Sequence, residues 1–81
     1  MVRFLIELEK PFDPDRDTGV DRSMLIRFAL QASDYWADHA LAWLEAGSDV
    51  PSVSDALRQF SADRGRPQAD RHRALALLRR A

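Results

Sequence analysis

The second half of this chain reads as a degenerate copy of its middle. The segment Leu25–Ala29 aligns with Leu57–Ser61 at an offset of 32 residues, and His39–Leu44 aligns with Arg73–Leu78 at an offset of 34. An insertion of two residues near Gly65 reconciles the two offsets. Self-similarity at such a period is typical of stacked helix pairs, because each pair buries its apolar face only against a neighbour. The repeat therefore predicts an all-α fold.

The repeat also indicates where the helices break. From Ser23 the apolar residues recur with a period of about 3.6, and the stripe runs on in phase to Ala46. This stretch is one long helix or two. Because the second copy breaks at residues 65–67 (Gly-Arg-Pro), we expect two helices here, with the second beginning near Ser33. Two further helices follow, so we expect about four short helices arranged as two antiparallel pairs.

Each expected helix has one apolar face that should be buried in the core. Both tryptophans fall on such a face, and in a domain this small they would supply much of the buried area. The residues expected on these faces are Leu25, Phe28, Ala29, Ala32, Trp36, Ala40, Trp43, Leu44, Val53, Ala56, Leu57, Phe60, Ala74, Leu75 and Leu78.

The N-terminal residues follow a different pattern. Apolar side chains alternate from Val2 to Leu8, which favours a strand, and Pro11 ends it. A lone strand must pair with another chain, most simply a second copy; the alternative is a short helix or an extended arm packed on the helices. The sequence thus predicts a single domain, 1–81, in which an extended or strand-like arm and an acidic loop (1–22) precede the helical pairs (23–81).

The composition and the lengths of the apolar runs indicate the class of protein and its cellular location. The 81 residues include no cysteine, 46% are hydrophobic and 31% are charged, which is ordinary for a folded soluble domain. No apolar run approaches the ~20 residues that span a bilayer, and no secretory signal begins the chain, so we expect a cytoplasmic protein with no membrane partner. Arginine outnumbers lysine eleven to one, a bacterial-like composition that a GC-rich genome explains.

Charge is divided unequally along the chain. Residues 1–57 carry five basic and eleven acidic groups, and residues 58–81 carry seven arginines and two aspartates. Arg66, Arg73 and Arg80 are seven residues apart and would form a stripe on one helix. Such a stripe could bind a protein partner or the phosphates of a nucleic acid. It could equally be solvated or pair with the acidic half, since no aromatic residue interleaves it and the pI is about 6.0.

Catalytic and metal-binding motifs are absent from the sequence. Asp13, Asp15 and Asp17 alternate as in a calcium loop, but the glycine and glutamate that such a loop requires are missing, so we interpret them as an acidic surface loop. His39 follows Asp34 and Asp38 on one helix but lacks the spacing of a zinc motif. We therefore expect no catalytic residue, no metal and no cofactor, and we do not expect an enzyme.

The helix pairs resemble HEAT-like α-helical repeat proteins in general style over about residues 23–81. They share paired amphipathic helices with a proline or polar break, although the period is shorter than the ~40–47 residues usual for that class. The resemblance carries no functional residue across. Stacked helix pairs usually form binding surfaces, so we expect a protein-interaction or self-association module, with a protein partner or a homodimer.

Tyr35 is the candidate contact residue because it falls outside the main apolar stripe. The alternative function is a nucleic-acid-associated regulator that binds through the arginine-rich last helix.

Overall fold

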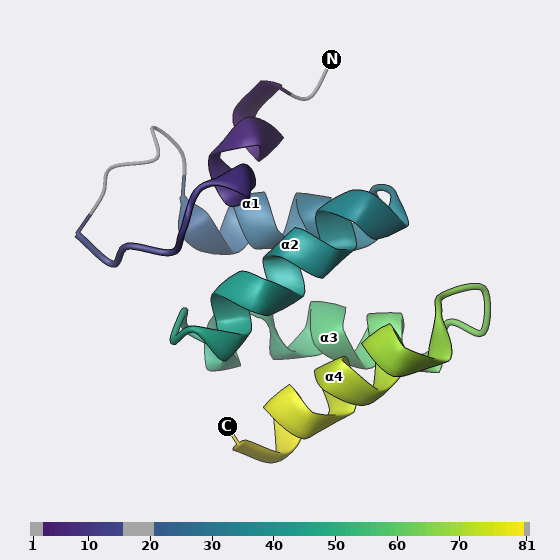
Figure 1. Ribbon diagram of the computed structural model, residues 1–81. Coiled ribbons are helices and arrows are strands. Elements are labelled where there is room, and N and C mark those ends of the chain that lie inside the picture. Colours follow the sequence, from purple (N-terminus) through teal and green to yellow (C-terminus); the bar gives the residue numbers. More distant parts are fainter. Residues whose placement is uncertain (1–2, 16–20, 81) are drawn as a thin grey trace.

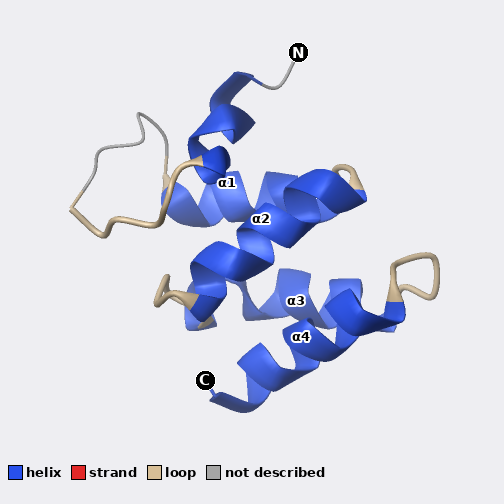
Figure 2. Ribbon diagram, viewed as in Figure 1, coloured by secondary structure: helices blue, strands red, loops and turns tan. Residues whose placement is uncertain are grey.

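The structure is a computed structural model that describes residues 3–15 and 21–80, with the side chains of residues 3 and 4 left out (Figure 1). Every regular element in these ranges is a helix, and no strand occurs in them (Figure 2). The elements in chain order are η1 (Arg3–Glu9), α1 (Arg22–Gln31), α2 (Asp34–Glu45), η2 (Pro51–Val53), α3 (Ser54–Ala62) and α4 (Gln68–Arg80), where η denotes a 3₁₀-helix. The expected all-α class with four α-helices is confirmed.

The N-terminal residues do not form the expected strand. Arg3–Glu9 is a 3₁₀-helix, and residue 2 lies outside the described ranges. In a 3₁₀-helix the side chains at i and i+3 share a face, which suits Leu5 and Leu8, both of which are fully buried. Ile6 is left 49% exposed. The alternative of a short helix packed on the other helices is the one observed.

The first long apolar stretch is two helices rather than one, as expected. The α1 helix begins at the Asp21 cap, whose carboxylate accepts hydrogen bonds from the backbone N–H (3.0 Å) and hydroxyl (2.9 Å) of Ser23. It ends at Ala32, whose backbone turns away from helical geometry, and α2 begins after Ser33. This corner lets α2 fold back across α1 (Figure 1).

A Schellman motif ends α2. The N–H of Ser48 donates to the carbonyl of Trp43 (3.1 Å), and the N–H of Gly47 donates to that of Leu44 (3.2 Å). Gly47 has φ of 124°, a region that residues with a Cβ rarely adopt. The glycine therefore fixes the direction in which the chain leaves α2 toward η2.

The four α-helices enclose one apolar core with η1 packed on its side. The α1 helix packs on α2, α3 packs on α4, and α2–α4 and α1–α3 contacts join the two pairs. In Figure 1, α2 and α4 lie in front of α1 and α3. The buried apolar residues are Leu5, Leu8, Leu25, Ile26, Ala29, Leu30, Ala37, Ala40, Leu41, Trp43, Leu44, Val53, Ala56, Leu57, Phe60, Ala74 and Leu77.

Two residues expected in the core lie outside it. Phe28 is 51% exposed, because α1 turns Ile26 and Leu30 inward instead. Leu75 is 42% exposed, because α4 buries Leu77. In both helices apolar residues extend over neighbouring faces, so the pattern placed Leu25, Ala29 and Ala74 correctly but not Phe28 and Leu75.

A candidate protein-binding groove

A groove of about 470 Å³ runs between the arm, defined as residues 3–15, and the second half of α2. Its two walls come from segments about thirty residues apart in the sequence. The lining residues are Leu8, Glu9, Lys10, Pro11, Phe12, His39, Ala42, Trp43 and Ala46. His39, Ala42 and Ala46 lie three or four positions apart and so share one side of α2. Because Ala42 and Ala46 have short side chains, the groove is shallow on the α2 side.

Trp43 fixes the arm against α2. Its ring is only 3% exposed, and its indole Nε1–H donates to the backbone carbonyl of Lys10 at 2.9 Å. The ring of Phe12 packs on that of Trp43 with centroids 5.7 Å apart and planes tilted by 59°. On the Phe12 ring lies the guanidinium of Arg22, 5.4 Å from the centroid, and this arginine also donates to the carbonyl of Pro14 at 2.8 Å. The indole of Trp43 is therefore part of the core and also part of the groove lining.

Tyr35, Trp36 and His39 form an aromatic cluster at the α2 end of the groove. The Tyr35 ring packs edge-on against Trp36, with centroids 4.9 Å apart, and against His39 at 4.8 Å. The phenol O–H donates to the carboxylate of Glu9 on the arm, and this bond is the main reason that the pKa of Tyr35 is raised above its ordinary value. Tyr35 remains 54% exposed. The residue expected to contact a partner thus lies exposed where the arm meets α2.

Acidic groups dominate the charge of the arm wall. Residues 7–15 carry four carboxylates and one ammonium group, Lys10, which pairs with Glu7 at 3.0 Å. In the described ranges, no ion pair joins Glu9, Asp13 or Asp15 to a cation. The groove lining is mostly apolar, and its charged residues are Glu9 and Lys10. The rim on the arm side, defined as residues 7–15, is negatively charged overall because four carboxylates outnumber one ammonium group.

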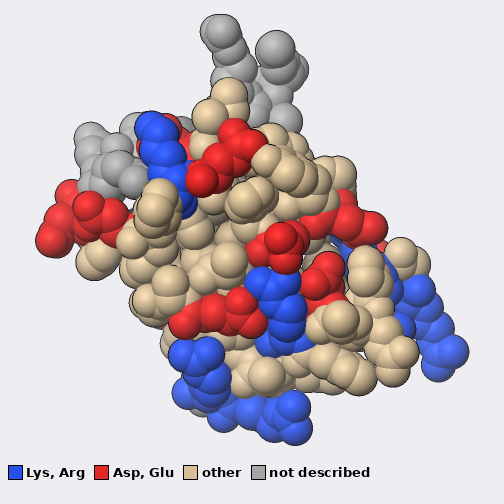
Figure 3. Space-filling view, viewed as in Figure 1, with Lys and Arg blue, Asp and Glu red and all other residues tan. Residues whose placement is uncertain are grey.

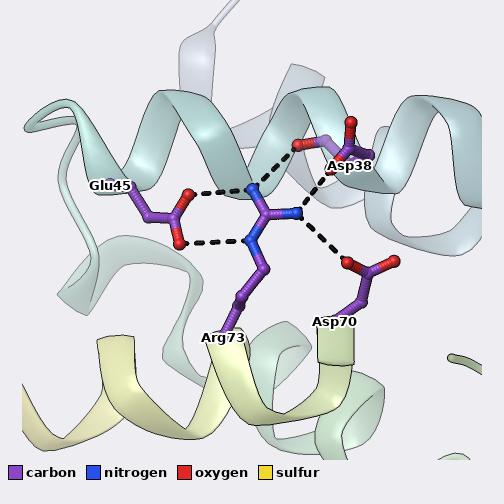
Figure 4. A network of polar contacts seen from close by, with 4 residues as sticks. All are labelled: Asp38, Glu45, Asp70 and Arg73. Atoms are coloured by element: carbon purple, nitrogen blue, oxygen red, sulfur yellow. Dashed lines mark hydrogen bonds and ion pairs between the residues drawn. The ribbon is translucent and has the colours of Figure 1, made fainter. Parts of the chain in front are cut away.

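The arginine stripe faces α2 in two of its three positions. Arg73 lies between α4 and α2, where it donates to both carboxylate oxygens of Glu45 (3.1 and 2.8 Å) and to Asp38 (2.5 Å) and Asp70 (3.1 Å) (Figure 4). Its side chain is 26% exposed, and these bonds, led by those to Glu45, raise the pKa of the guanidinium above its ordinary value. This geometry corresponds to one of the alternatives considered for the basic segment, that it pairs with the acidic half.

Arg66 makes a similar connection to the first helix pair. It donates to the carboxylate of Asp34 at 3.0 Å and to the carbonyl of Leu30 at 2.8 Å, and its guanidinium lies 5.1 Å from the ring centroid of Phe60. Its side chain is 14% exposed. Arg80, by contrast, is exposed, and no ion pair involves it in the described part of the chain. Figure 3 shows acidic side chains along α2 and basic ones at both ends of α4.

Those acidic residues singled out in the sequence that the structure describes do not converge on a metal site. Asp34 and Asp38 pair with arginines, and His39 stacks on aromatic rings. The Asp13 carboxylate accepts from the backbone N–H of Asp15 at 2.9 Å, and residues 16–20 lie outside the described ranges. Within residues 3–15 and 21–80, no group of three or more acidic or histidine side chains could hold a metal ion.

The groove itself was not predicted from the sequence. Its walls meet only because Arg3–Glu9 is helical, whereas the alternating pattern favoured a strand. One signal was present: Pro11 and Pro14 indicate that the chain turns directly after the apolar segment.

No protein family model, curated protein or solved structure matches this chain. The fold alone thus defines its class, which is that of small all-helical proteins. No described helix has the length and apolarity required to cross a membrane.

Proposed function

We propose that this chain is a cytoplasmic protein-interaction module without catalytic activity, and that its binding surface is the groove between the arm and α2. The observation that carries the proposal is the aromatic cluster beside an apolar groove: Tyr35 is exposed, Trp36 and His39 are partly buried, and His39 lines the groove. Aromatic side chains next to an apolar pocket are the usual anchors of protein interfaces, since they offer a large contact area at a low cost in side-chain entropy.

The groove also indicates the chemistry of its partner. An apolar interior and a low wall of alanines suit a helix that inserts one aliphatic side chain. The negatively charged rim favours basic residues beside that anchor. The fitting partner is therefore an amphipathic helix with an aliphatic anchor and flanking arginine or lysine.

The arrangement of the helices is part of this proposal. We propose that α1–α2 and α3–α4 are two units of a HEAT-like repeat, with residues 1–81 as one domain. The close packing of α1 on α2 and of α3 on α4 supports it, as does the turn that separates the helices in each pair. The groove then uses an outer surface of the first pair and leaves the contact between pairs undisturbed.

Binding of nucleic acid through α4 has less support. Two of the three stripe residues, Arg66 and Arg73, are engaged in ion pairs within the chain. A phosphate would have to compete with the carboxylates that already pair with these two guanidinium groups.

A pull-down from native lysate tests the function. The wild-type chain and the Ala42→Arg variant are compared, both with nuclease treatment. Ala42 is exposed on α2, so arginine should fill the groove without disturbing the core. We expect a protein that the wild type retains in stoichiometric amount and the variant loses. Equal capture by both chains would contradict the groove, and loss of all bound material on nuclease treatment would favour nucleic acid.

A further inference from the structure

The outward face of α4 has the same chemistry as the partner that the groove requires. His72, Leu75, Ala76 and Arg79 are exposed at spacings of i, i+3, i+4 and i+7, which places them along one side of the helix. Leu75 is 42% exposed and is the aliphatic residue at the centre of this face. The burial of Leu77 on the opposite side sets this orientation.

The charge of this face complements that of the groove. Arg79 and Arg80 end α4 and form no ion pair in the part of the chain that is described. The carboxylates of Glu9, Asp13 and Asp15 on the arm are likewise without a cation. Among the described residues, the arginines at the end of α4 and these three carboxylates thus form no ion pair, whereas Arg66 and Arg73 do.

The two surfaces cannot meet within one molecule. Within one molecule, α4 packs on the core through the buried Ala74 and Leu77, and it meets α2 through Arg73, which pairs with Asp38 and Glu45 (Figure 4). Residues 72, 75, 76 and 79 point away from this contact, since they are exposed. Only a second chain can bring such a face to the groove.

We propose that the groove binds α4 of a second copy of this chain, with Leu75 inserted between the arm and α2 and Arg79 beside the acidic rim. This inference rests on the proposed function, because it names the occupant of the same groove. The contact joins two different surfaces, so each copy presents both a donor helix and an acceptor groove.

Sedimentation equilibrium of the purified chain tests the proposal. We expect the mean mass to rise with concentration, and the association to weaken as salt rises, since exposed charges are screened. Leu75→Asp removes the anchor and Ala42→Arg fills the groove, and each should weaken self-association at least about tenfold. Both positions are exposed, and unchanged far-ultraviolet circular dichroism should show that the variants fold.

Mixing the two variants gives the decisive result. Ala42→Arg retains an intact α4 face and Leu75→Asp retains an intact groove, so an equimolar mixture should form a one-to-one complex. As a matched control, Met24→Asp changes a residue that is 51% exposed on α1, outside the groove, and should associate as the wild type does. No complex in the mixture, or loss of association in Met24→Asp alone, would overturn the proposal.

The outcomes separate this inference from the proposed function. Suppose that the wild-type chain is monomeric at every concentration, and that it retains a cellular protein in the pull-down which the Ala42→Arg variant does not retain. This would show that the groove binds another protein. Such a result overturns the α4 contact and leaves the interaction module standing. If the chain is monomeric and the pull-down also shows no difference, both proposals fail.

Discussion

Tyr35 reports on how the arm is held against α2, because it is the only tyrosine in the chain and its hydroxyl donates to Glu9 on the arm. A carboxylate that accepts the phenol proton disfavours the phenolate, so the pKa of Tyr35 lies above the ordinary value of 10.0. The folded state binds this proton more tightly than the unfolded state does. The resulting contribution to stability is complete below about pH 10 and is lost as the pH rises through the raised pKa.

We predict that Glu9→Gln returns the pKa of Tyr35 toward its ordinary value, because a glutamine carries no charge and can donate to the phenolate. Ultraviolet absorbance titration measures this directly, since the tryptophans do not ionise. Glu7→Gln is the matched control: it removes a neighbouring carboxylate that pairs with Lys10, and the titration should stay as in the wild type. An ordinary pKa in the wild-type chain would mean that the arm does not hold this contact in solution.

For Tyr35, the sequence predicted that the side chain is exposed but did not predict its partner. Tyr35 was expected outside the core from its place off the apolar stripe, and it is exposed. Its bond to Glu9 could not be foreseen, because it depends on the arm being helical. Arg66 and Arg73 were considered both as binding residues and as partners of the acidic half, and spacing along one helix cannot tell which way that helix faces.

At the scale of the elements, the end of α2 determines where the second helix pair begins. Gly47 adopts φ of 124°, and a Cβ placed there would lie 3.8 Å from the ring of Phe12, an ordinary contact distance. The obstacle to any other residue is therefore its own backbone rather than crowding. Gly47 directly follows the apolar stripe that runs to Ala46, which is where a glycine commonly ends a helix, and its positive φ agrees with that pattern.

Gly47→Ala should lower the free energy of unfolding by about 1–2 kcal/mol, because alanine pays the backbone penalty that glycine avoids. Urea denaturation followed by circular dichroism measures the loss. Gly65→Ala is the comparison, since Gly65 has no positive φ and its Cβ would approach only the flexible Asp63 carboxylate at 3.2 Å. Its cost should be below about 0.5 kcal/mol. Equal losses of unfolding free energy in the two variants would mean that the end of α2 tolerates a residue with a Cβ at position 47.

The helices themselves were easier to predict than their packing. Breaks at Ser33 and Gly47 carry local signals in turn and cap chemistry, and both appear in the structure. The choice between neighbouring apolar faces has no local signal. Phe28 and Leu75 were therefore expected in the core, whereas Ile26, Leu30 and Leu77 are the residues buried against the neighbouring helices.

At the scale of the whole molecule, three arginines join the first helix pair to the second. Arg27 on α1 pairs with Asp55 on α3 at 2.8 Å, and Arg66 and Arg73 reach back to α2. The unequal division of charge along the chain is thus largely resolved inside the molecule. The sequence offered this outcome as one of several, because net charges of segments do not specify geometry.

Arg73 should be the most important of these connections, since its planar guanidinium contacts three carboxylates at once and is largely shielded from water. We predict that Arg73→Met lowers the free energy of unfolding by about 1–3 kcal/mol, because three carboxylates are left to repel one another. Arg73→Lys should retain part of the stability, since lysine keeps the charge but lacks the planar fork.

Arg58→Met provides the control for this series, because Arg58 is exposed on α3 and forms no ion pair in the described ranges. It should change stability by less than about 0.5 kcal/mol. Urea denaturation at low protein concentration keeps self-association from contributing to the result. If Arg73→Met and Arg58→Met were equally stable, the two helix pairs would be held together by the apolar core alone, and the arginine contacts would only align them.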